Sequence, residues 1–307
     1  MAILKEIWAT DIAEKLFPSN SFIGQSVDDS MWVSGKKVHR ANAGDLPGVQ
    51  KDRTVFPAPV TPRTDEDADY NIHEHTSDPT RIRDIEEIET NYQKRQSVLS
   101  GHIKVINNSI ANWMAHDWAP TAEANFIRTS GADRPANLDG ATGTRKKLTV
   151  EDILKAKAIL DDMDLPMDGR NILIPSHMYN DMLLSEYKYL ESLDKQGKAV
   201  LKDGNIAALF GLKIFIRGKK NVLSYTNAAT PALRTPVATT GKATANAAAL
   251  LWHKDFVARA KGDVKVYHNE DDATIYGSVF SAMARAGGQK TYLDGTGVMA
   301  IIEAAGA

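Results

Sequence analysis

The strongest hydrophobic pattern in the chain is one long helical stripe. Its apolar residues are separated alternately by four and three positions, which places them on one helix face: Leu99, Ile103, Ile106, Ile110 and Trp113. The stripe predicts a helix over residues 91–118, because a capping residue precedes it and Pro120 follows it. Gly101 lies inside this segment and lowers its helix propensity by about 1 kcal/mol relative to alanine.

Other apolar patterns predict a chain that mixes helices and strands. Thr149 and Asp152 resemble a capping box before a helix over residues 149–163, and a short amphipathic helix is expected over residues 3–17. A helix is also expected from His177 to Ser185. The remaining apolar runs predict short strands, bounded in the last part of the chain by Gly262, Gly287 and Gly288: 171–175, 212–217, 250–257, 264–267, 275–283 and 298–302.

The segment over residues 19–77 predicts a long extended excursion. Prolines interrupt it at positions that no helix could cross, and residues 70–75 alternate with a period of two, as in a thin hairpin arm. An arm with so few large apolar groups cannot bury itself, so it is either a linker or a segment that packs on another subunit. Residues 130–147 and 221–246, which are rich in small and polar residues, are expected to be loops.

Composition excludes several classes of protein. The absence of cysteine excludes disulfides, thiolate zinc sites and cysteine nucleophiles. The longest unbroken apolar run covers six residues, so no signal peptide or membrane-spanning helix is expected. With 37 basic and 39 acidic side chains, the net charge cannot by itself drive tight binding to nucleic acid or to an anionic membrane.

The candidate chemistry is sparse. His73 and His75 have the i, i+2 spacing of a metal pair on a strand, but no third ligand is evident, and the acidic run at residues 65–67 lacks the other features of a calcium loop. His102 and His116 flank the long stripe without an evident acidic partner. No phosphate-binding loop, dinucleotide fingerprint or nucleophile elbow occurs, so no catalytic residue, metal ligand or cofactor is assigned.

The tryptophans predict core anchors and contacts. Trp113, Trp118 and Trp252 accompany apolar periodicity and are interpreted as core residues. Trp8 and Trp32 lie outside the predicted cores. Two interpretations of these residues have similar weight, namely that they are buried against a neighbouring chain or that they are simply exposed.

The order of these parts resembles the major capsid proteins of tailed bacteriophages, which have the Hong Kong 97 fold. The segments that carry the resemblance include Leu46-Pro47-Gly48-Val49, Arg53-Thr54-Val55 and His73-Glu74-His75-Thr76 in the extended loop. Tyr92-Gln93-Lys94-Arg95 resembles the entry to the family's spine helix, here residues 91–118. Further matches lie later in the chain: Gly169-Arg170-Asn171-Ile172, Phe210-Gly211-Leu212-Lys213 and Ala249-Leu250-Leu251-Trp252-His253.

The resemblance implies an α+β fold and a division of the chain into five parts. These are an N-terminal arm (1–30), an extended β-hairpin loop (31–77), a peripheral domain with the spine helix (78–130), an axial domain (131–248) and a return to the peripheral domain sheet (249–307). It also implies candidate inter-subunit contacts on the arm and loop: Trp8, Trp32, Arg53, Phe56, Arg63 and Tyr70.

The function implied is that of a structural protein rather than an enzyme. It would assemble with itself into hexamers and pentamers, as an icosahedral shell in the virion around packaged double-stranded DNA. Because the predicted fold begins within a few residues of Met1, a separate scaffolding protein is implied. The resemblance also implies a portal as a partner and assembly in the host bacterial cytoplasm, and no membrane partner is expected. The alternatives are an encapsulin-like bacterial nanocompartment shell and a cytosolic α/β hydrolase using His177 or His253.

Overall fold

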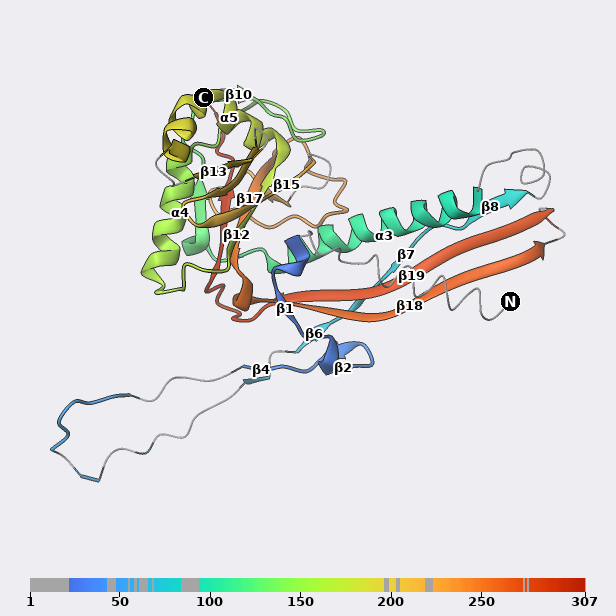
Figure 1. Cartoon of the computed structure of the whole chain (residues 1–307), viewed down its shortest axis with the longest axis horizontal. Helices are drawn as coiled ribbons and strands as arrows, with labels where there is room; N and C mark the ends of the chain where they lie inside the picture. Colours follow the sequence, from blue (N-terminus) through green and yellow to red (C-terminus); the bar gives the residue numbers. More distant parts are fainter. Residues whose placement is uncertain are drawn as a thin grey trace.

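The computed structural model describes residues 22–42, 48–54, 56–57, 60, 66–67, 69–83, 94–195, 199–202, 205–218, 223–272, 274 and 276–306. The expected helix over residues 3–17 lies outside this part of the chain. In the described part, a compact lobe and an elongated lobe meet end to end, and a thin arm extends away from both (Figure 1).

The elongated lobe is a five-stranded sheet with one long helix along it (Figure 1). The strands β18 and β19 form an antiparallel hairpin, β1 pairs with β18 in parallel, and β7 and β8 pair with β19. The bounds are β1 (Val27–Asp28), β7 (His73–Thr76), β8 (Thr80–Arg83), α3 (Lys94–Trp118), β18 (Val257–Asp272) and β19 (Gly277–Lys290).

The helix α3 confirms the long hydrophobic stripe. Ile103, Ile106 and Ile110 are at most 6% exposed and pack into the main core, and the helix ends at Trp118 as expected. Gly101 does not interrupt the helix. Trp113 is only half-buried, because its ring lies between the rings of His73 and His116 and not in the core.

The compact lobe is built on an eight-stranded sheet in the order β13-β14-β15-β12-β17-β20-β9, with β16 paired to β17. Side chains of the central strands alternate between two cores: Leu250 and Ala300 face the core shared with α3, whereas Leu251 and Ile301 face the core beneath helices α4 and α5. Burial on both faces explains why these strands are continuous apolar runs.

Two helices pack with this sheet in the described part of the compact lobe. The bounds are β9 (Phe126–Arg128), α4 (Val150–Asp162), β12 (Arg170–Pro175), α5 (Ser176–Lys195), β13 (Ala199–Lys202), β14 (Asn205–Leu209), β15 (Leu212–Arg217), β16 (Leu223–Thr226), β17 (Ala245–His253) and β20 (Val298–Ile302). The capping box of α4 is present, with both the Thr149 and Asp152 side chains bonded to backbone N–H groups.

An aromatic junction joins the two lobes. The rings of Phe22, Trp118 and Trp252 lie with their centroids 5.8–6.0 Å apart. The Trp118 indole donates a hydrogen bond of 2.9 Å to the carbonyl of Ala258, and the Trp252 indole donates one of 2.8 Å to the carbonyl of Gln25. The interpretation of these two tryptophans as core anchors is confirmed, and both are 0% exposed.

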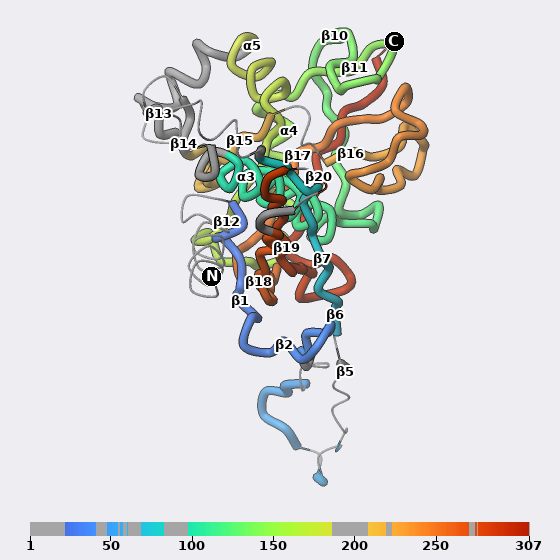
Figure 2. The backbone as a smooth tube through the Cα atoms, turned by 90° about the vertical axis from the view of Figure 1, so that its right-hand side faces the viewer, coloured from blue at the N-terminus to red at the C-terminus, as the bar shows by residue number. Residues whose placement is uncertain are grey.

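The base of the arm consists of very short strands. The sheet β2-β3-β6 and the pair β4-β5 connect the lobes to the described tip, residues 48–54 and 56–57, which lies far from both lobes in two orthogonal views (Figures 1 and 2). The bounds are β2 (Val33–Ser34), β3 (Lys37–Val38), β4 (Ala41–Asn42), β5 (Glu66–Asp67) and β6 (Tyr70–Asn71), with 3₁₀ turns at Phe22–Gly24, Ser30–Trp32, Glu123–Asn125 and Lys254–Phe256.

Several sequence expectations about loops and boundaries are wrong. The segment 130–147 contains the hairpin β10 (Asp133–Pro135) and β11 (Thr144–Lys146), and 221–246 contains β16 and the start of β17. The return segment 70–77 belongs to sheets rather than to a free arm. The strand β20 pairs with β17 and β9 in the compact lobe, so residues 298–302 do not return to the sheet of the spine helix.

Gly287 and Gly288 lie inside β19 and do not end a strand. A Cβ on Gly287 would lie 2.5 Å from the carbonyl oxygen of Asn71, and a Cβ on Gly288 would lie 2.6 Å from the sulfur of Met114. The two glycines therefore permit the close approach of β6, α3 and β19 at this end of the sheet.

Candidate assembly surfaces

The arm exposes large apolar side chains that the described part of the chain does not cover. Val49, Phe56 and Val60 are 96%, 76% and 93% exposed, and Met31 and Trp32 near the base are 90% and 63% exposed. Scattered exposed apolar residues are normal on a protein surface. Several of them on one thin arm are instead typical of a surface that binds a partner.

The six predicted contact residues have different positions. Trp32 and Phe56 are exposed and Arg53 is half-buried, whereas Trp8 and Arg63 lie outside the described residues. Tyr70 is 7% exposed and packs with Val38 and Ile72 in a small core of its own chain. The sequence could not distinguish Tyr70 from the exposed members of the set, because alternation alone does not tell which face is covered.

A buried carboxylate organises the base of the arm. Asp29 is 4% exposed and accepts hydrogen bonds from Arg40 at 3.0 Å and from the Tyr70 hydroxyl at 3.3 Å. Burial, together with the charge of Asp29, raises the pKa of Tyr70 far above its ordinary value. Tyr70 therefore remains a hydrogen-bond donor to Asp29, and this bond ties β6 to the turn that contains Asp29.

Arg259 fastens the preceding segment to β18. Its guanidinium donates to the carbonyl oxygens of Ile23 and Ser26 at 2.9 and 3.0 Å and pairs with Asp28 at 3.2 Å. These contacts hold residues 22–30 against the long hairpin.

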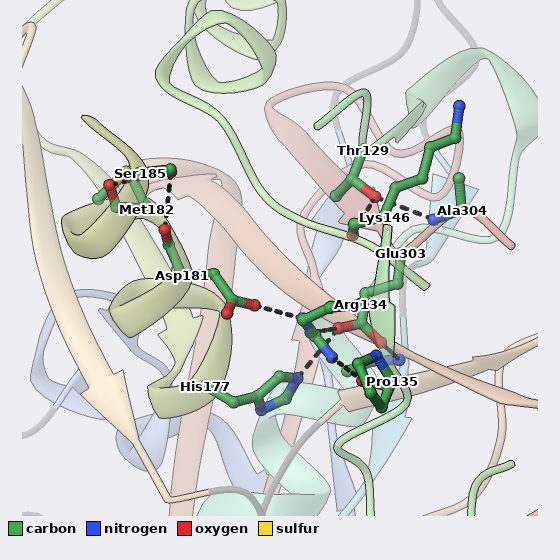
Figure 3. Close-up of polar contacts among 11 residues, drawn as sticks. Thr129, Arg134, Pro135, Lys146, His177, Asp181, Met182, Ser185, Glu303 and Ala304 are labelled. Carbon is green, nitrogen blue, oxygen red and sulfur yellow. Dashed lines mark hydrogen bonds and ion pairs between the residues drawn. The ribbon is translucent and has the colours of Figure 1, made fainter. Parts of the chain in front are cut away.

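A second charge cluster lies inside the compact lobe (Figure 3). Arg134 from β10 donates to Asp181 on α5 and to Glu303, the residue after β20, and His177 lies 3.1 Å from the same Glu303 carboxylate. The other Glu303 oxygen accepts the Ala247 backbone N–H at 3.1 Å. Burial alone would raise the pKa of Glu303, but these partners outweigh it and hold that pKa below its ordinary value.

This cluster is structural and does not provide a hydrolytic site. His177 has the acidic partner that a catalytic histidine requires, but its Nδ1 atom is buried without a hydrogen-bond partner among the described residues, so no nucleophile is activated there. The His253 ring contacts two backbone groups, the carbonyl of Asp168 from a distant part of the chain at 2.8 Å and the N–H of its near neighbour Asp255 at 3.3 Å. Neither histidine has the geometry that the hydrolase alternative requires.

The histidines considered for metal binding have other partners. His75 is buried against Ser109 of α3, with 3.0 Å between Nδ1 and Oγ, and burial lowers its pKa. His116 lies 3.1 Å from Asp117, so it does have an acidic partner, contrary to the expectation from the sequence. Within the described ranges, no group of three or more metal-ligating side chains occurs.

A pocket of about 440 Å³ lies where the arm, α3 and β19 meet. Its lining combines Tyr70 and Asn71 of β6, His116 and Asp117 of α3, Gly288 to Lys290 of β19, and the apolar side chains of Leu233 and Leu293. The Lys290 ammonium donates to the carbonyl of Ala119 at 3.3 Å, and burial lowers its pKa. Segments distant in sequence form this pocket, so no local motif indicates it.

Comparison with known protein families identifies the family of this chain. The family model described as phage capsid protein matches residues 109–292, more than half of the chain. The chain belongs to the phage capsid protein family. This family builds capsids, so the protein is a structural shell protein of a bacteriophage virion that assembles with itself, and it is not an enzyme.

Solved structures agree on the fold of this capsid protein. The capsid of Ralstonia phage GP4 has a TM-score of 0.65 at 12% identity, with 96% of this chain and 91% of that chain covered. The capsid of cyanophage P-SCSP1u has a TM-score of 0.59 at 19% identity, with coverages of 92% and 86%. The mixed α+β fold and the resemblance to the Hong Kong 97 capsid proteins are thereby confirmed.

The fold alone does not separate phage shells from other shells. A virus-like particle from Pyrococcus furiosus matches with a TM-score of 0.54 at 9% identity, covering 97% of this chain and 99% of that chain. The phage family model decides against the nanocompartment alternative. A search of curated proteins finds no match to this sequence. None of the helices in the described ranges is long and apolar enough to span a membrane.

Proposed function

We propose that this capsid protein forms hexamers and pentamers that close into an icosahedral shell around packaged double-stranded DNA. The observation that carries the proposal is the arm, whose apolar tip residues are left uncovered by the described part of their own chain. An extended arm laid over a neighbour adds contact area without a rigid face, so the same subunit can close rings of two sizes.

The proposed contacts are those predicted on the arm and loop. Trp32 and Phe56 have the side-chain exposure that a contact with a neighbour requires. The half-buried Arg53 is retained as a candidate, together with Trp8 and Arg63. Tyr70 contributes by holding the base of the arm through Asp29. Removing one exposed aromatic anchor from such an interface typically weakens it far more than removing its neighbours.

The proposed domains follow the two lobes. The eight-stranded lobe is the axial domain, and the five-stranded sheet with α3 is the peripheral domain. The chain would pass from the N-terminal arm and extended loop to the peripheral domain, then to the axial domain, and return through β18 and β19. The strand β20 is assigned to the axial domain.

The proposed partners are a separate scaffolding protein, a portal and the packaged DNA, with assembly in the host bacterial cytoplasm. The DNA contact is non-specific in this proposal. A formal net charge of -2 suits a container, because strong attraction between shell and DNA would oppose packaging.

Size-exclusion chromatography followed by negative-stain electron microscopy tests the assembly proposal. The recombinant chain, with and without a candidate scaffolding protein, is expected to give closed shells or isolated capsomers. Deleting residues 52–69, which removes Phe56 and the strand β5, should leave a soluble chain that does not assemble. A persistent monomer from the full chain under both conditions, or normal shells from the deleted chain, would overturn the proposal.

A further inference from the structure

The pocket at the base of the arm and the exposed tip of the arm complement each other. The tip carries Phe56, a large apolar side chain that is 76% exposed, and the same arm carries the exposed Val49 and Val60. The pocket, of about 440 Å³, has apolar side chains at Leu233 and Leu293, and Leu293 is 60% exposed. A phenyl ring is small enough to enter such a space and would cover both leucines.

Charge also favours this pairing. The described tip carries Lys51, Asp52 and Arg53, a net charge of +1. The Asp and Lys side chains that line the pocket are Asp69, Asp117 and Lys290, a formal charge of -1, and the Lys290 ammonium donates to the carbonyl of Ala119. Opposite net charges on two contacting surfaces favour their encounter and fix their register.

The geometry of the arm separates the tip from the pocket of its own chain. The strand β6 lies at the base of the arm, whereas the described tip residues lie at its far end in both views (Figures 1 and 2). A contact between the tip and this pocket would therefore join two different chains. Because the tip and the pocket are different surfaces of the chain, the contact is head-to-tail and generates rings where the rotation closes.

We propose that Phe56 of one subunit inserts between Leu233 and Leu293 in the pocket of a second copy of this chain. This inference rests on the proposed function, since it requires subunits that assemble. It names the specific surface that receives the arm: the end of α3, β6 and the end of β19.

Single cysteines provide a direct test because the chain has none of its own. Thr54→Cys chains, which keep Phe56 at the tip, and Leu293→Cys chains are prepared separately, mixed in equal amounts, assembled, and treated with a short bismaleimide. Each chain then carries one cysteine, so a tip–pocket link can only join two different chains. With random mixing of subunits in head-to-tail rings, about half of the chains are expected in covalent dimers.

A matched control uses a leucine on the other lobe. Leu184 on α5 is 84% exposed, so Leu184→Cys replaces Leu293→Cys as an exposed thiol, and Thr54→Cys mixed with it is expected to give only background dimers. Closed shells that give no excess of dimers with Leu293→Cys over this control would overturn the inference and leave the proposed function intact. A failure of the wild-type chain to form shells would overturn both.

A second variant tests the pocket without cross-linking. Leu293→Asp places a charge at an exposed site, so the fold is retained, and it should lower the fraction of chains in shells by about tenfold. Leu184→Asp is expected to leave that fraction unchanged. Equal yields from the two variants would count against docking at the pocket, and circular dichroism of both chains checks that each remains folded.

Discussion

In β20 every side chain from Val298 to Ile302 is 0% exposed, whereas in the arm Val49, Phe56 and Val60 are 96%, 76% and 93% exposed. Both segments carry apolar residues, but only the first buries them within the described part of its own chain. The central strands contribute to the stability of the monomer, and in the proposed assembly the arm would contribute to the contacts between subunits. A substitution in the central strands should therefore lower the free energy of unfolding of the monomer. A substitution in the arm should leave that free energy unchanged and lower the fraction of chains in shells.

The largest effect on the monomer is expected at the junction of the lobes. Trp252→Ala removes a fully buried indole and its hydrogen bond to Gln25, so the free energy of unfolding should fall by about 3–5 kcal/mol. Urea denaturation of the unassembled chain measures it. Trp32→Ala, at a site 63% exposed, is the control and should change it by less than about 0.5 kcal/mol. Similar losses in the two variants would contradict the comparison.

The next effect concerns the charge cluster of the compact lobe. Glu303→Gln leaves Arg134 with Asp181 as its one carboxylate partner in the cluster and His177 with none. It should lower the free energy of unfolding by about 3 kcal/mol at pH 7. Asp168→Asn, which removes a 99% exposed partner of Lys254, is the control and should cost less than about 1 kcal/mol.

The same variant predicts a change in pH dependence. The folded-state pKa of Glu303 is lowered, so its stabilisation is complete above the ordinary pKa of 4.5 and is lost as the pH falls through the folded pKa. Glu303→Gln should therefore unfold with a shallower dependence on pH in the acidic range than the wild type. Parallel pH profiles for the two proteins would show that the carboxylate is not stabilised as described.

A smaller effect is expected where the backbone segments approach closely. Gly288→Ala would place a Cβ 2.6 Å from the Met114 sulfur, and the resulting overpacking should cost about 2 kcal/mol. Gly101→Ala is the matched control, since an added Cβ there would have no described neighbour within 4 Å, and it should stabilise α3 by about 0.5–1 kcal/mol. Thermal denaturation should give shifts of opposite sign, and shifts of the same sign would contradict the packing described at Gly288.

The smallest effect on the monomer is expected at the arm tip. Phe56→Ala should change the free energy of unfolding by less than about 0.5 kcal/mol, because the side chain is 76% exposed. The same variant should assemble poorly, as judged by sedimentation of shells. Destabilisation of the monomer by more than about 1 kcal/mol, on the scale of ordinary core substitutions, would mean that the arm is buried in its own chain.

Local patterns were sufficient for the elements whose stability is local. The spacing of Ile103, Ile106 and Ile110 predicts α3, and Thr149 with Asp152 predicts the start of α4. The strand β12 follows from a short apolar run before Pro175. In each case the signal lies within one turn or one strand of the residues that form the element.

The elements that sequence patterns did not indicate depend on distant partners. The hairpin β10–β11 has little apolar alternation, and Arg134 in it is buried by Asp181 and Glu303, which lie far along the chain. Gly287 and Gly288 indicate a turn in isolation, but the structure places them opposite Asn71 and Met114. The pocket has the same origin, because its lining comes from separate regions of the chain. Periodicity carries no information about such pairings.

The aromatic junction at the end of α3 has a mechanical consequence. The helix is fastened there by the rings of Trp118, Trp252 and Phe22, and its other end lies far from the compact lobe (Figure 1). At 1.5 Å per residue the helix is about 37 Å long, so a rotation of about 5° at Trp118 would displace its far end by about 3 Å. The end of the helix at Trp118 is thus held in place by packing, and a small rotation there is amplified along the length of the helix. A rotation too small to disrupt the packing of the aromatic junction is therefore enough to change the curvature of a shell built from such subunits.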